Sequence, residues 1–190
     1  MPAPVSQASY RDNLLRANRA VIDRIRAIVA PVSANAMLRR PPNGGWSIAE
    51  VLEHLIVSAD SYLGMLRPIV EREKGRGSAG DATWKPTLMG GLLVGSFRSP
   101  RKRPAPRIYQ PGPTPRAQAL EEFIKRQEQV GRLLSEAGAL DWRGIRVRSP
   151  VISLIRMNLG DALTVLVVHA ERHAGQIERV KAATTNGRES

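Results

Sequence analysis

The stretch VLVVHAERHAGQIERV, residues 165–180, contains two of the three histidines of the chain, His169 and His173. On a helix, with about 100° per residue, both histidines fall inside the arc of apolar side chains, and the charged residues fall on the other side. Residues 159–182 are therefore predicted to form an amphipathic helix that buries two imidazoles. Because a buried polar group without a hydrogen bond costs roughly a few kcal/mol, these rings need polar partners.

Two kinds of partner would satisfy a pair of buried imidazoles one helical turn apart. One is a metal ion shared by both rings, since neutral imidazole is a common ligand of divalent metals. The other is a set of hydrogen bonds to further side chains of the core. The pair by itself leaves both interpretations open.

The third histidine, His54, lies in the stretch GWSIAEVLEHLIVSAD, residues 45–60, which has the pattern of a second amphipathic helix. Ser47 begins this helix and Glu50 follows three residues later, the signature of a capping box. Glu50 is therefore expected to be a helix cap first and a partner of His54 second. Because the chain has no other histidine and no cysteine, one histidine from this helix and the pair from the late helix form a candidate site with three nitrogen ligands.

The order of these motifs resembles that of a known family, the DinB/YfiT-like four-helix bundles, which are proposed metalloenzymes. The residues that carry the resemblance are Trp46, Ser47, Glu50 and His54, followed far downstream by His169, His173, Gln176 and Ile177. The resemblance covers roughly residues 7–182. It implies that His54, His169 and His173 are the metal ligands.

Four amphipathic segments predict an all-α fold, with helices at about 7–30, 47–73, 114–137 and 159–182. Thr114 is the expected cap of the third helix, with Pro115 at its first position. The long connection 75–113 lets the second and third helices run parallel. We therefore expect a single domain, residues 1–190, folded as an up-down-down-up four-helix bundle with a long crossover connection between helices 2 and 3. The apolar, glycine-rich residues 88–97 are expected to lie across one end of it.

The composition excludes several classes of protein. A chain of 190 residues is long enough for a full core, and its aromatic content of 4% suits a helical bundle better than a β-sandwich. The absence of cysteine excludes disulfides, and neither a secretory signal nor a membrane-spanning segment is recognisable. A cytoplasmic protein is the expectation. Apolar positions in the glycine-rich loop lead us to expect a homodimer.

Three imidazoles without a carboxylate leave a divalent ion with an open position, which is typical of catalytic sites. Zinc, nickel and iron(II) all accept such ligands. Glu171 lies about 200° around the helix from both neighbouring histidines and should point to solvent. Gln176 lies one turn after His173, where it is a candidate for a ligand-orienting hydrogen bond or a substrate contact. A buried amide bonded to the backbone is the alternative for Gln176.

The resemblance implies metal-dependent chemistry, and some relatives are transferases or isomerases that use low-molecular-weight thiols. We expect a metal-dependent enzyme that acts on a small molecule, preferably a thiol-dependent transferase, with a metal-dependent hydrolase as the alternative. The chain has a net charge of +12, and residues 98–116 form a basic loop. Arg101 in this loop and Arg146 further along the chain are candidates for a rim that binds anions. Nucleic-acid binding is the other class, but few aromatic residues accompany the arginines and no known binding module is recognisable.

Overall fold

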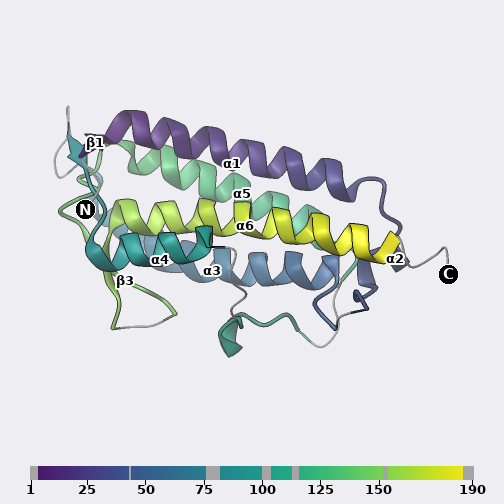
Figure 1. The fold of residues 1–190 in the computed structure, drawn as a ribbon. Helices are drawn as coiled ribbons and strands as arrows, with labels where there is room; N and C mark the ends of the chain where they lie inside the picture. Colours follow the sequence, from purple (N-terminus) through teal and green to yellow (C-terminus); the bar gives the residue numbers. More distant parts are fainter. Residues whose placement is uncertain are drawn as a thin grey trace.

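The computed structural model describes residues 4–42, 44–75, 82–99, 104–112, 116–151 and 154–185. Within these residues, four long helices pack lengthwise into a bundle (Figure 1). They are α1 (Gln7–Val29), α3 (Ile48–Glu73), α5 (Ala119–Glu136) and α6 (Leu159–Thr185). Helices α1 and α3 each contact both α5 and α6. The predicted all-α helical bundle is confirmed.

The sequence signal at the start of α3 has its expected structural role. The hydroxyl oxygen of Ser47 accepts a hydrogen bond from the backbone N–H of Glu50, and the Glu50 carboxylate accepts one from the backbone N–H of Ser47. This capping box satisfies two of the N–H groups that the first turn of a helix leaves without a partner. The predicted capping role of Glu50 is confirmed.

Ser47→Ala removes one half of this capping box. Because Ser47 is fully buried, we expect its loss to lower the free energy of unfolding by about 1–2 kcal/mol. Urea unfolding followed by circular dichroism measures the change. The matched control is Ser135→Ala in the exposed part of α5, where a change of less than about 0.5 kcal/mol is expected. Equal losses of unfolding free energy in the two variants would contradict the capping role of Ser47.

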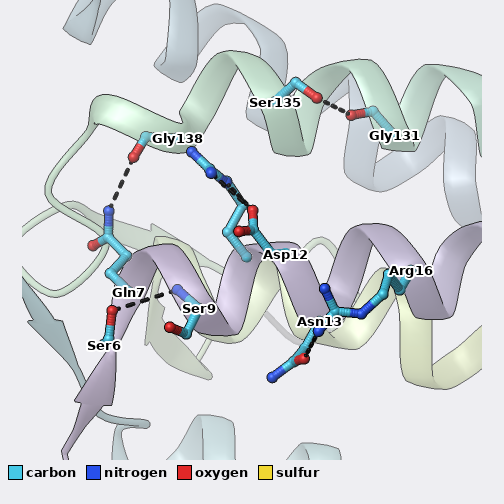
Figure 2. A network of polar contacts seen from close by, with 10 residues as sticks. Ser6, Gln7, Ser9, Asp12, Asn13, Arg16, Gly131, Ser135 and Gly138 are labelled. Carbon is cyan, nitrogen blue, oxygen red and sulfur yellow. Dashed lines mark hydrogen bonds and ion pairs between the residues drawn. The ribbon is translucent and has the colours of Figure 1, made fainter.

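Hydrogen bonds join four helix ends at one end of the bundle. Strand β1 (Val5–Ser6), just before α1, pairs antiparallel with β2 (Thr83–Trp84), which follows α3. Figure 2 shows the Gln7 side chain reaching from the first turn of α1 to the carbonyl oxygen of Gly138, beyond the end of α5. Asp161, in the first turn of α6, accepts hydrogen bonds from the backbone and hydroxyl of Thr87. Helices α1 and α6 therefore run one way along the bundle, and α3 and α5 run the other way.

The long connection after α3 contains helix α4 (Leu88–Arg98), which packs along α6 (Figure 1). The expectation that this apolar stretch lies across one end of the bundle was wrong. Gly90 explains the close approach of the two helices, because a Cβ atom at this position would collide with the side chain of Asp161. The outer face of α4 leaves Leu88 and Leu92 exposed.

The third long helix begins later than the sequence predicts. The expected cap at Thr114 and the proline after it lie outside the described residues, and α5 begins at Ala119 without a side-chain cap. The backbone N–H and the guanidinium of Arg116 donate to the carboxylate of Glu53 on α3. These bonds hold the segment before α5 against α3 in a turn.

Shorter elements complete the described chain. The bundle end carries an antiparallel hairpin, in which Arg146 pairs with Asn158. Among the described residues, none of the helices combines the length and the apolar character that crossing a membrane requires. The remaining elements are α2 (Ala34–Leu38), η1 (Arg107–Tyr109), η2 (Ala137–Ala139), β3 (Arg146–Arg148) and β4 (Arg156–Asn158).

The apolar core is divided into two clusters along the bundle axis. One cluster includes Trp142 and Leu163, and the other includes Phe123 and Ile48. Between the residues of these clusters the long helices contribute buried or half-buried polar side chains, which we call the polar layer: Asn18 of α1, His54 and Ser58 of α3, Gln127 of α5, and the half-buried His169 and buried His173 of α6. Because buried polar groups are costly unless they are paired, this layer is where a functional site is expected.

Candidate metal centre

The three histidines of the chain meet in the polar layer. The Nε2 atom of His169 lies 3.1 Å from Nε2 of His54 and 3.1 Å from Nε2 of His173. Helix α6 supplies the last two rings from successive turns of one face, and α3 supplies the first from the facing helix. Among the described residues, these three side chains form the one group whose ligating atoms all lie within 4.8 Å of one another.

The outer nitrogen atoms of two rings are held by hydrogen-bond acceptors. The Nδ1 atom of His54 lies 2.6 Å from the carbonyl oxygen of Tyr109, and Nδ1 of His173 lies 2.8 Å from Oε1 of Gln176. Since an oxygen of this kind only accepts, each Nδ1 carries the proton and each Nε2 presents a lone pair. The lone pairs of His54 and His173 therefore both point toward Nε2 of His169.

This arrangement contains too few protons for its nitrogen atoms. A neutral His169 has at most one proton on Nε2, and this proton reaches only one of the two facing lone pairs. At least one buried nitrogen is then left facing another nitrogen, which costs roughly 1–3 kcal/mol. A cation at the meeting point of the three Nε2 atoms removes the mismatch, because each ring then contributes a lone pair.

Burial keeps the rings in the neutral form that binds metals. Desolvation lowers the pKa of His54, although the hydrogen bond to the Tyr109 carbonyl opposes this effect. Desolvation, helped by the charge on neighbouring groups, lowers the pKa of His173 to about 3 and holds the pKa of His169 well below its ordinary value. All three imidazoles are therefore neutral near pH 7.

Aromatic side chains and the long connection enclose the rings. The Trp46 ring lies 5.1 Å from the ring of His54, and the Phe97 ring, from the end of α4, lies 5.0 Å from that of His169. Arg172 donates hydrogen bonds to the carbonyl oxygens of Phe97 and Ser99, so it holds the end of α4 against α6. The connection between α3 and α5 thus supplies one wall of the site.

The roles of Tyr109 and Phe97 were missed by the sequence reasoning. Tyr109 acts on His54 through its backbone carbonyl, so its residue type carries no signal for this contact. Its hydroxyl donates to Ser61 on α3, which holds η1 against that helix. Phe97 belongs to an apolar stretch whose position in the fold could not be read from its spacing.

The structure separates the other predicted site residues. Gln176 accepts from His173, whereas the Glu50 carboxylate is bonded to Ser47 and Arg40 within the cap of α3. Glu171 is exposed, as expected.

One of the two residues of the candidate anion rim lies in the described part of the chain. Arg101 lies outside the described residues. Arg146 pairs with Asn158, the residue directly before α6. Asn158 precedes His169 by a length of helix of about 16 Å. The hairpin register, which the sequence did not predict, thus places Arg146 away from the histidines. The positive charges of Arg172 and Arg179 lower the pKa of His173.

Comparison with known proteins supports the family resemblance. The searches of curated proteins and of solved structures found no match. The sequence pattern of the DinB superfamily matches residues 17–177, a span that contains all three histidines and Gln176. Since this match covers most of the chain, the protein belongs to the DinB superfamily.

Proposed function

We propose that His54, His169 and His173 hold one divalent metal ion, and that the protein is a metal-dependent enzyme acting on a small molecule. The observation that carries the proposal is the convergence of three neutral imidazoles with too few protons between them. Two of these rings already have their outer nitrogens bonded to oxygen acceptors, as the histidine ligands of protein metal sites usually do.

The donor set suits zinc, nickel or ferrous iron, all of which accept imidazole nitrogen. Among the described residues, the cluster contains three histidines and no carboxylate, so a four-coordinate ion keeps one position for a ligand from solution. When bound, such an ion lowers the pKa of a coordinated thiol or water and polarises carbonyl oxygens.

The surroundings of the rings favour an anionic ligand of modest size. The positive charges of Arg172 and Arg179 act on His173, and Arg172 also acts on His169. Trp46 and Phe97 provide apolar surfaces beside two of the rings. These features support a low-molecular-weight thiol with carboxylate groups as the partner in a transfer reaction.

Carboxylates near His54 are engaged elsewhere, which disfavours hydrolysis assisted by a general base. Glu50 is bonded to Ser47 and Arg40 in the helix cap. Glu53 accepts from the backbone and the guanidinium of Arg116. Transfer of a thiol has less need of such a base, because metal coordination favours loss of the thiol proton.

Adding a small thiol is the test that separates the two reactions. We expect the metal-loaded protein to consume an electrophilic substrate only when a low-molecular-weight thiol is present, with the sulfur atom of the thiol covalently bonded to the product. Mass spectrometry of the reaction mixture measures both. Substrate consumption in buffer alone, with water incorporated, would instead establish the hydrolase.

Gln176→Leu removes the acceptor that holds the Nδ1 proton of His173. Because outer partners of this kind orient the ligand, we expect metal affinity to fall by about 10- to 100-fold. Competition with a chelator of known affinity measures the change. Glu171→Gln is the matched control on the same helix, since Glu171 is exposed and faces away from the rings. Equal affinities in wild type and Gln176→Leu would argue against the orienting role.

A further inference from the structure

A small cavity lies inside the bundle next to His169, with a volume of about 10 Å³. Its wall is mostly apolar, but it includes Ser58 from α3 and Gln127 from α5. Both belong to the polar layer between the two apolar clusters. The cavity therefore lies on the side of His169 that is lined by the three long helices α3, α5 and α6.

Two polar atoms at this cavity have no partner among the described residues. They are Oγ of Ser58 and Oε1 of Gln127, which belong to side chains only 4% and 1% exposed. Leaving such atoms without a hydrogen bond costs roughly 1–3 kcal/mol each. The position of Gln127 is itself held firmly, because Asn18 on α1 donates to its backbone carbonyl at 2.9 Å.

The size and chemistry of the cavity match one water molecule. About 10–15 Å³ is the smallest cavity volume that accommodates a water, and a buried water needs two to four polar partners. Ser58 and Gln127 supply two partners, and His169 supplies a third. A cavity lined by apolar groups alone would be expected to stay dry.

The ring of His169 has one nitrogen left for this purpose. Its Nε2 atom faces the other two histidines, so the remaining nitrogen is Nδ1. Helical side chains lean over the preceding turn, and Val165 and Leu166 in that turn line the same cavity. His54 and His173 have oxygen acceptors at the corresponding atom. Within the part of the chain that the structure describes, His169 is the ring for which no such partner is seen.

We propose that this cavity binds one ordered water molecule, which bridges Ser58, Gln127 and Nδ1 of His169. The water accepts the Nδ1 proton and donates to Oε1 of Gln127, so all three imidazoles present Nε2 lone pairs to a common point. Ser58 and Gln127 are then positioning residues that act on His169 through the water. The water site stands without any metal, whereas the positioning role rests on the proposed metal site.

A crystal structure of the metal-free protein at high resolution tests the water site. In wild type we expect one water within hydrogen-bond distance of Ser58 Oγ, Gln127 Oε1 and His169 Nδ1. In Gln127→Met, which replaces the amide by an apolar chain of similar length, this water should be lost. Ser58→Ala, which removes a single hydroxyl group from the cavity wall, is the second variant. An empty cavity in the wild-type protein would overturn the proposal.

Zinc affinity, measured against a competing chelator, tests the positioning role. We expect Gln127→Met to bind zinc about 10- to 100-fold more weakly, whereas Gln127→Glu, which keeps an acceptor oxygen, should not be weakened. The visible spectrum of bound Co²⁺ should shift in Gln127→Met, because the orientation of one ligand changes. Val130→Ala is the matched control, a fully buried site one turn along α5 that does not line the cavity.

The outcomes separate the two parts of the inference. If Gln127→Met binds zinc as wild type does, or if Val130→Ala is weakened equally, Gln127 does not position His169. If the wild-type protein binds no zinc, nickel or iron, the proposed function fails. The crystal structure of the metal-free protein then still decides whether the water site exists.

Discussion

Substituting His169 by alanine is expected to remove the bound metal from the protein. His169 is central to the cluster, because its Nε2 atom lies 3.1 Å from those of both His54 and His173. Without it, an ion would keep two protein ligands from different helices, too few for a stable zinc site. Elemental analysis of protein purified without an affinity tag should give about one ion per wild-type chain and almost none for the variant.

His54→Ala and His173→Ala should show the same loss, since each ring contributes one Nε2 atom. Arg146→Ala is the matched control, because Arg146 lies on the hairpin at the bundle end and should leave the metal content unchanged. Circular dichroism establishes that each variant remains helical. A wild-type protein that is purified without metal and takes up neither zinc nor nickel would refute the proposed site.

The metal-free protein is expected to lose stability steeply as the pH falls below about 6.5, the ordinary pKa of histidine. Burial lowers the pKa of all three histidines, so the rings stay neutral in the folded protein while those of the unfolded chain take up protons. Stability therefore rises with pH across this window and is lost as pH falls. Between about pH 7.5 and pH 5.5 the loss is up to about 4 kcal/mol for three rings that stay neutral when folded.

Urea unfolding in the presence of a chelator, at several pH values, measures this dependence. His173→Gln is the informative variant, because its side chain does not titrate and the pKa of His173 is lowered to about 3 by burial. We expect the variant to lose about one third of the pH dependence. The contribution of Asp161 to the pH dependence of stability has the opposite sign, because burial raises the pKa of its carboxyl group. Asp161 therefore cannot produce the predicted loss of stability at low pH. A stability that is flat between pH 7.5 and 5.5 would contradict the prediction.

Local sequence patterns determined the long helices and part of the site. Apolar spacing identifies the segments that became α1, α3 and α6 to within a few residues, because amphipathic periodicity is a property of each segment alone. The capping box of Ser47 and Glu50 and the shared face of His169 and His173 are also set within one or two turns of helix. The start of α5 was predicted less well, because Arg116 is held by Glu53 on another helix.

The tertiary structure decided everything that depends on contacts between distant segments. It brings His54 to the pair on α6, gives that ring the carbonyl of Tyr109, and packs α4 along α6 through Gly90. It also leaves Oγ of Ser58 and Oε1 of Gln127 without a hydrogen-bond partner among the described residues and places Arg146 away from the rings. Amphipathic spacing shows which side chains are buried, but the partner of a buried polar group is set by how the helices pack, so these features could not be read from the sequence.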